Sequence, residues 1–203
     1  MTSQPKITYL TPGEYLAVER QNEYRSEYID GEMVAMTGAS RRHNIIAVNI
    51  TSSLDRQLAD RPCEIYAGDM RVRIASRREY AYTYPDVVVV CGEPQFEDEH
   101  LDTLLNPTVI VEVLSESTER YDRGKKFSFY RAIESLAEYV LVAQDEFKVE
   151  QYVQRPDGRW LLSDHSSLET VVELASVKCS LALRDVYKKV SLPPSDLKEG
   201  QLL

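Results

Sequence analysis

The chain has 203 residues, of which 43% are hydrophobic and 28% charged, as expected for a globular protein with one sizeable core. No segment approaches the roughly 20 apolar residues that span a bilayer, and residues 1–6 lack the features of an export signal, so we expect a cytoplasmic protein with no membrane partner. The net charge of −9 argues against a protein that coats nucleic acid non-specifically, because such binding depends on Lys and Arg side chains that neutralise phosphates.

The first sixty residues carry clear helix and turn signals. Residues 11–14 read Thr-Pro-Gly-Glu, a capping box with proline at the first helical position, which predicts a helix to about residue 20. An Asp-Gly pair at residues 30–31 predicts a two-residue hairpin over residues 27–36. Ser40 can cap a second helix with apolar residues at helical spacing, which we expect to end near residue 60.

Strand signals follow. The apolar positions change phase between residues 63–67 and 70–74, which predicts a bulge or kink around Gly68. Residues 87–91 and 108–114 are apolar, β-branched runs, typical of strands covered on both faces, and an acid-rich loop over residues 92–106 separates them. Cys63, Cys91 and Cys179 lie far apart without a CxxC pair or a nearby histidine, so we expect buried reduced thiols rather than a zinc site.

The C-terminal half predicts a helix from Ser117 or Thr118 through about residue 133, a buried strand over residues 139–142, and a hairpin formed by residues 147–153 and 159–162. After Leu183 the sequence becomes polar. This order predicts an α/β (α+β) fold, with a mixed sheet flanked by helices and extra hairpins. We expect a single domain over residues 1–190 and a polar C-terminal tail over residues 191–203.

Two carboxylates stand out in this pattern. Glu112 lies inside an otherwise apolar strand, where a lone charge costs several kcal/mol unless something compensates it. Asp86 stands at the start of the preceding strand, so the two carboxylates can converge at one sheet end and share a cation such as Mg²⁺. The alternative is that Asp86 caps a turn and Glu112 pairs with an internal Lys or Arg.

The helix that follows places Asp122, Lys126 and Tyr130 on one face, because they are spaced at four-residue intervals. Lys126 could reach over the sheet end and stabilise charge on a reacting phosphate, or it could form only a salt bridge with Asp122. Two basic clusters are either solvated faces or phosphate contacts, and the sequence leaves both open. The first cluster consists of Arg120, Arg123, Lys125, Lys126 and Arg131. The second consists of Arg71, Arg73, Arg77 and Arg78.

Pro85-Asp86, followed about 25 residues later by Glu112-Val113-Leu114, resembles the PD-(D/E)XK nuclease signature. More narrowly, the sequence is similar to the Uma-type family of restriction endonucleases, over residues 10–183. The motifs that carry the similarity are residues 28–32, His43, residues 84–87, residues 111–118, residues 122–127, Tyr130 and residues 138–139. The resemblance implies a restriction-endonuclease-like fold.

The match departs from the superfamily at Leu114, which stands where the usual lysine would be. The resemblance implies that Lys126 replaces it from the next helix, with Lys125 as the alternative. It also suggests an additional acid from an early element, for which Glu27 is the candidate, and His43 as a base or substrate-side residue. As a lone histidine, His43 is more often a surface or cap residue. Asp69, at the predicted kink, is a weaker candidate.

The resulting hypothesis is hydrolysis of DNA phosphodiester bonds, with Mg²⁺, or Mn²⁺, held by Asp86, Glu112 and the carbonyl of Val113. A homodimer is expected by analogy with such folds. The rival hypothesis is a catalytically weak or inactive nuclease-fold module that binds nucleic acid or a protein partner. Hydrolysis of another phosphate ester stays open. A serine or cysteine nucleophile is disfavoured, because no Gly-x-Ser-x-Gly elbow and no Cys–His neighbour occurs.

Overall fold

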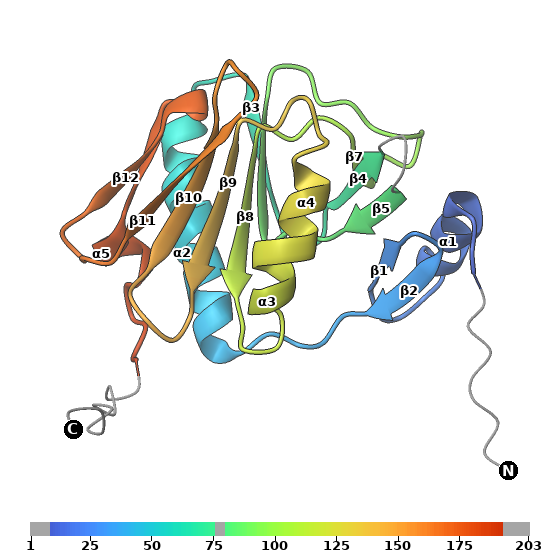
Figure 1. The fold of residues 1–203 in the computed structure, drawn as a ribbon, viewed down its shortest axis with the longest axis horizontal. Coiled ribbons are helices and arrows are strands. Elements are labelled where there is room, and N and C mark those ends of the chain that lie inside the picture. The colour runs from blue at the N-terminus through green and yellow to red at the C-terminus, as the bar shows by residue number, and fades with distance from the viewer. Residues whose placement is uncertain (1–8, 76–79, 193–203) are drawn as a thin grey trace, which may run out of the picture.

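The computed structural model describes residues 9–75 and 80–192. A six-stranded mixed sheet forms the centre, in the order β11-β10-β9-β8-β6-β3 (Figure 1). β8 and β9 are parallel, and their other neighbours are antiparallel. The strands are β3 (Cys63–Ala67), β6 (Val87–Cys91), β8 (Val109–Leu114), β9 (Glu138–Ala143), β10 (Val149–Gln154) and β11 (Trp160–His165).

A second sheet has the order β2-β1-β5-β4-β7, and a separate pair is formed by β12 (Val171–Leu174) and β13 (Cys179–Ala182). The five strands are β1 (Ser26–Ile29), β2 (Glu32–Ala35), β4 (Arg71–Ala75), β5 (Tyr80–Thr83) and β7 (Thr103–Leu104). The predicted hairpin is confirmed as β1–β2, and both turn residues have positive φ, 48° at Asp30 and 103° at Gly31. The sequence did not predict β5, β7, β12 or β13.

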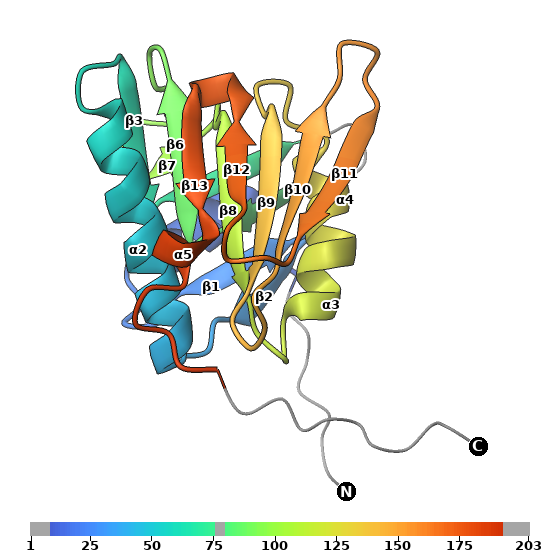
Figure 2. The same cartoon turned by 90° about the vertical axis from the view of Figure 1, so that its left-hand side faces the viewer.

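Helices cover both faces of the central sheet, whereas the first helix packs against the second sheet. α1 (Pro12–Glu19) has the predicted capping box, and α2 (Arg41–Leu58) is capped by Ser40. α2, β12 and β13 lie on one face of the sheet, whereas α3 (Glu119–Tyr121) and α4 (Phe127–Tyr130) lie on the other (Figure 2). In the described part of the chain, no helix is long and apolar enough to cross a membrane.

Strand alternation divides the central sheet between two cores. Val87, Val89, Val109 and Val111 pack in the core that contains the apolar stripe of α2. The even-numbered positions of β6 and β8 pack instead with α4 and the second sheet. Because Glu112 is an even position of β8, its side chain belongs to the α3–α4 side.

Two local expectations were wrong in part. The phase change near Gly68 is not a bulge within one sheet, because β3 belongs to the six-stranded sheet and β4 to the five-stranded one. The predicted long helix is interrupted by a π-helical segment, η1 (Asp122–Lys126), which contains Gly124, a poor helix former, and α4 ends at Tyr130. α5 (Leu183–Val186) buries its apolar residues in the core, inside the single domain expected over residues 1–190. Residues 193–203 lie outside the described residues.

The expectation of three reduced cysteines was also wrong. Cys63 and Cys91 form a disulfide with a Cα–Cα distance of 4.0 Å, and Cys179 is free and buried. The two half-cystines are direct cross-strand partners in the β3–β6 ladder. Their separation of 28 residues hid this pairing in the sequence, because it depends on the register of two strands.

The cluster of Arg71, Arg73, Arg77 and Arg78 does not form a solvated or phosphate-binding face as far as it is described. Arg71 is only 3% exposed and pairs with Asp102 at 2.7 Å, while Arg73 pairs with Glu97 at 3.2 Å. Arg77 and Arg78 lie outside the described residues.

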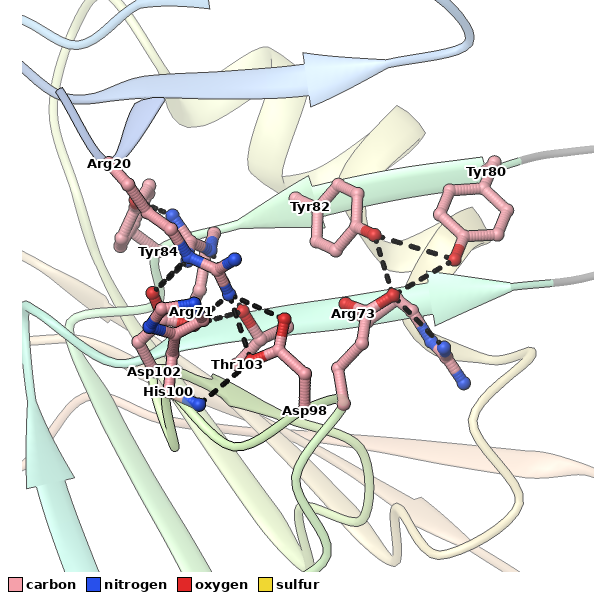
Figure 3. A network of polar contacts seen from close by, with 11 residues as sticks. Arg20, Arg71, Arg73, Tyr80, Tyr82, Tyr84, Asp98, His100, Asp102 and Thr103 are labelled. Carbon is pink, nitrogen blue, oxygen red and sulfur yellow. Dashed lines mark hydrogen bonds and ion pairs between the residues drawn. The ribbon is translucent and has the colours of Figure 1, made fainter. Parts of the chain in front are cut away.

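The acid-rich loop is therefore anchored internally. Arg20 donates hydrogen bonds to Asp98 and Asp102, and Arg71 donates to Tyr84 and Thr103 (Figure 3). These contacts tie α1, β4 and the loop that precedes β7 into one network. Asp98 and Asp102 are thus paired with arginines and lie apart from the candidate metal ligands.

Candidate active site

Glu112 is held in the interior by two polar partners. Its side chain is 5% exposed, and burial raises its pKa well above the usual value. The Tyr130 hydroxyl donates a hydrogen bond to Glu112 Oε1 at 2.8 Å, and Lys126 Nζ lies 3.0 Å from the same oxygen. Tyr130 also exchanges a hydrogen bond of 3.0 Å with Thr83 Oγ1 on β5. The carboxylate is thus fixed in orientation from the helix side.

Lys126 is shared by three carboxylates. Besides Glu112, its Nζ lies 3.0 Å from Glu27 Oε1 and 3.5 Å from Asp122 Oδ1, and none of these side chains is more than 8% exposed. Burial opposes the charge on Lys126, but Glu112, Glu27 and Asp122 outweigh burial and raise its pKa well above the usual value. Burial raises the pKa of Asp122 as well. One ammonium among three acids leaves a surplus of negative charge if all of them ionise.

Asp86 lies at the open side of the cluster. Its Oδ2 accepts a hydrogen bond of 2.7 Å from the Val113 N–H, and His43 Nε2 lies 3.2 Å from the same oxygen. Val87 pairs with Val111 in the antiparallel β6–β8 ladder, so one further step along the register places Asp86 opposite Glu112. With side-chain exposures of 20% and 15%, Asp86 and His43 are the more accessible members.

The structure brings all five candidate side chains into one cluster, although they come from five separated segments. Lys126 joins Glu27 and Glu112, and His43 joins Asp86. The contact between Glu112 and an internal lysine, which the sequence offered as an alternative to metal binding, is therefore present, and so is the Lys126–Asp122 pair.

Other candidates lie apart. Lys125 is exposed and stands over the Phe129 ring at 5.6 Å, away from the carboxylates that surround Lys126. Asp69 pairs with Arg25 rather than with the cluster. Thr83 was missed by the sequence reasoning, because β5 itself was not recognised. The run Tyr-Ala-Tyr-Thr of β5, rich in residues that favour strands, was the signal available.

The donor set fits a hard divalent cation in part. Among residues 9–75 and 80–192, no group of three or more His, Cys, Asp or Glu side chains forms a metal-binding cluster. Magnesium is commonly bound through only one or two carboxylates, with water and substrate phosphate completing its shell. The facing pair Asp86 and Glu112 provides such carboxylates.

Residues 12–184 match the model of the Uma2 family, which is described as "Putative restriction endonuclease". A protein of Synechocystis sp. PCC 6803, "Uncharacterized protein sll1609", is 40% identical over 169 residues, which cover 83% of this chain and 94% of the relative. A second Synechocystis protein, "Uncharacterized protein slr1290", is 35% identical over 179 residues, or 88% of this chain and 92% of the relative.

A crystal structure described as a putative nuclease belonging to DUF820, from Anabaena variabilis, is similar with a TM-score of 0.71. The two chains are 19% identical, and the match covers 88% of this chain and 97% of the other. This likeness concerns the fold alone, and it confirms the nuclease-like mixed fold predicted from the sequence. The family match over residues 12–184, with two relatives aligned over most of their length, shows that this chain belongs to the Uma2 family of restriction-endonuclease-like proteins.

Proposed function

We propose that the chain is a metal-dependent endonuclease that hydrolyses DNA phosphodiester bonds. The observation that carries the proposal is the cluster at the end of β6 and β8, where Asp86 faces Glu112 and Lys126 contacts Glu112 at 3.0 Å. The family to which the chain belongs and its nuclease-like structural neighbour point to the same chemistry.

Asp86, Glu112 and the carbonyl of Val113 would hold Mg²⁺ or Mn²⁺, which supplies Lewis acidity toward a phosphoryl oxygen and lowers the pKa of a bound water. The Val113 N–H fixes Asp86, and the Tyr130 hydroxyl fixes Glu112, so both carboxylates are preorganised.

Lys126 contributes positive charge near the reacting phosphate, where a preorganised ammonium stabilises the negative charge that develops in the transition state. Glu112, Glu27 and Asp122 hold this ammonium in place and raise its pKa, so it stays protonated. His43, on the exposed side of Asp86, is placed to orient Asp86 or to accept a proton from the substrate side.

Plasmid cleavage in the presence and absence of Mg²⁺ tests this function. Wild-type protein should nick or linearise the plasmid only with metal, and Asp86→Asn and Glu112→Gln should each abolish cleavage while circular dichroism shows a retained fold. Lys125→Met is the matched control for Lys126→Met, because the two lysines are neighbours and only Lys126 is buried. Lys126→Met should reduce cleavage and Lys125→Met should not. Wild-type cleavage by Asp86→Asn, Glu112→Gln and Lys126→Met would overturn the assignment.

A second candidate is a nuclease-fold module without turnover. It is favoured by the Glu112–Lys126 pair, which can neutralise Glu112 without a metal ion. Calorimetric titration with Mg²⁺ and Mn²⁺ separates the two functions. The enzyme must bind the metal ion, and Asp86→Asn should abolish this binding, whereas the module without turnover does not need the metal. The proposed homodimer is checked by light scattering on the same samples.

A further inference from the structure

The β1–β2 hairpin connects the buried cluster to the surface. Glu27 and Val34 are direct cross-strand partners, so their side chains lie on the same face of the hairpin. Glu27 is buried and reaches Lys126, whereas Val34, on the edge strand β2, is 48% exposed. The opposite face of the hairpin is covered, because Tyr28 and Met33 pack in the core beneath α1. One hairpin face thus runs from the catalytic lysine to solvent.

The next residue pair continues this surface. The Met36 N–H donates a hydrogen bond of 2.9 Å to the Arg25 carbonyl, which extends the hairpin beyond its regular ladder. The Arg25 side chain is 46% exposed and Met36 is 40% exposed. An apolar surface of Val34 and Met36 therefore adjoins an exposed guanidinium.

The Arg25 guanidinium stands beside the segment that positions Asp86. It contacts the Gly68 carbonyl at 3.4 Å and the Asp69 carboxylate, and it lies over the Tyr84 ring at 5.6 Å. The Gly68 N–H in turn donates to the Asp86 carbonyl at 3.0 Å. Arg25 is thus placed on the side of Asp86, the more open side of the cluster, from which a substrate can reach it.

We propose that Arg25, Val34 and Met36 form the surface that receives the nucleic-acid strand beside the scissile bond. Arg25 binds a flanking phosphate, and Val34 and Met36 pack against the adjoining sugar and base. The choice of ligand rests on the proposed function. The local charge supports it, because the half-exposed Arg25 guanidinium stands beside the segment that positions Asp86 and a guanidinium binds phosphate oxygens through paired hydrogen bonds. Because the contact is to phosphate, it favours binding without choosing a sequence.

Fluorescence anisotropy of a labelled DNA duplex tests this surface. Wild-type protein is titrated in chelator, so that no cleavage occurs, and at several salt concentrations. Arg25→Ala should weaken binding about 10-fold and reduce the salt slope by about one, as expected for one lost phosphate contact. Asp69→Asn, which releases Arg25 from its acidic partner, should tighten binding, and Val34→Ser should weaken it without changing the salt slope.

Arg159→Ala is the matched control, because Arg159 is also an exposed arginine paired with an aspartate, Asp157, but in the β10–β11 turn. It should bind DNA like the wild type. The proposal is overturned if Arg25→Ala binds like the wild type, if Arg25→Ala and Arg159→Ala weaken binding equally, or if the wild type does not bind DNA. If Arg25→Ala alone weakens binding but the wild type does not cleave DNA in Mg²⁺, the proposed function is contradicted and this surface is supported.

Discussion

Lys126 Nζ lies 3.0 Å from Glu27 Oε1, so a residue of the η1 turn is joined to a strand of the five-stranded sheet. The same ammonium contacts Glu112, which belongs to the six-stranded sheet. The buried ammonium of Lys126 therefore contacts both sheets at the candidate site.

Substitution of Lys126 should lower both the stability and the activity of the protein. Lys126→Met leaves Glu27, Glu112 and Asp122 buried without their shared partner, and breaking a buried pair costs about 3–5 kcal/mol. We expect a loss of that size in urea unfolding, and cleavage reduced by about 10²–10³-fold. Lys125→Met should change the free energy of unfolding by less than about 0.5 kcal/mol. Similar effects of the two substitutions would contradict the role of Lys126.

The Tyr130 hydroxyl should act through Glu112. Tyr130→Phe keeps the ring but removes the hydrogen bond of 2.8 Å, which should lower the free energy of unfolding by about 1–2 kcal/mol. Because groups behind a metal ligand orient it, Mg²⁺ affinity should fall about 10-fold or more in calorimetry. Tyr24→Phe is the control, because Tyr24 is 79% exposed. Unchanged metal affinity in Tyr130→Phe would leave its hydroxyl a purely structural role.

The Asp102 network should make stability depend on acidic pH. Hydrogen bonds from Arg20, and then from Arg71, hold the pKa of the Asp102 carboxyl well below its ordinary value of 3.8. The folded state therefore binds this proton less readily than the unfolded state. The stabilisation is fully present above pH 3.8 and is lost as the pH falls through the folded pKa.

Asp102→Asn should accordingly flatten the fall in the free energy of unfolding below about pH 4. At neutral pH it should cost about 1–2 kcal/mol, a value reduced for the partial exposure of the site. Chemical unfolding between acidic and neutral pH measures both effects. Asp145→Asn, on an exposed turn, provides the comparison, and an equal pH profile in the two variants would contradict the network's contribution.

The disulfide predicts a defined thiol count. Denatured, unreduced protein should react at one cysteine, Cys179, and after reduction at all three. Closure of a loop of 28 residues stabilises the folded chain by about 3–4 kcal/mol through the unfolded state. The double substitution Cys63→Ala with Cys91→Ala should show that loss, whereas Cys179→Ala tests only core packing. Three reactive thiols before reduction would contradict the disulfide.

The sequence alone determined the features that depend on neighbours along the chain. The capping box at Thr11, the Asp30-Gly31 turn and the apolar stripe of α2 are local patterns, and the structure confirms each of them. The isolated charge of Glu112 in an apolar strand was also visible, because alternation and burial are encoded in a short window.

Tertiary structure decided which distant residues meet. Glu27 reaches Lys126 because β1 lies beside the helical segment, and Cys63 reaches Cys91 because the β3–β6 register pairs them. Arg71 is internal because Asp102 and Tyr84 approach it from other segments. Such contacts depend on strand order and register over long separations, which periodicity within a short window does not specify. The sequence therefore indicated the carboxylates and Lys126 as candidates, and only the fold showed which groups contact Glu112 and Asp86.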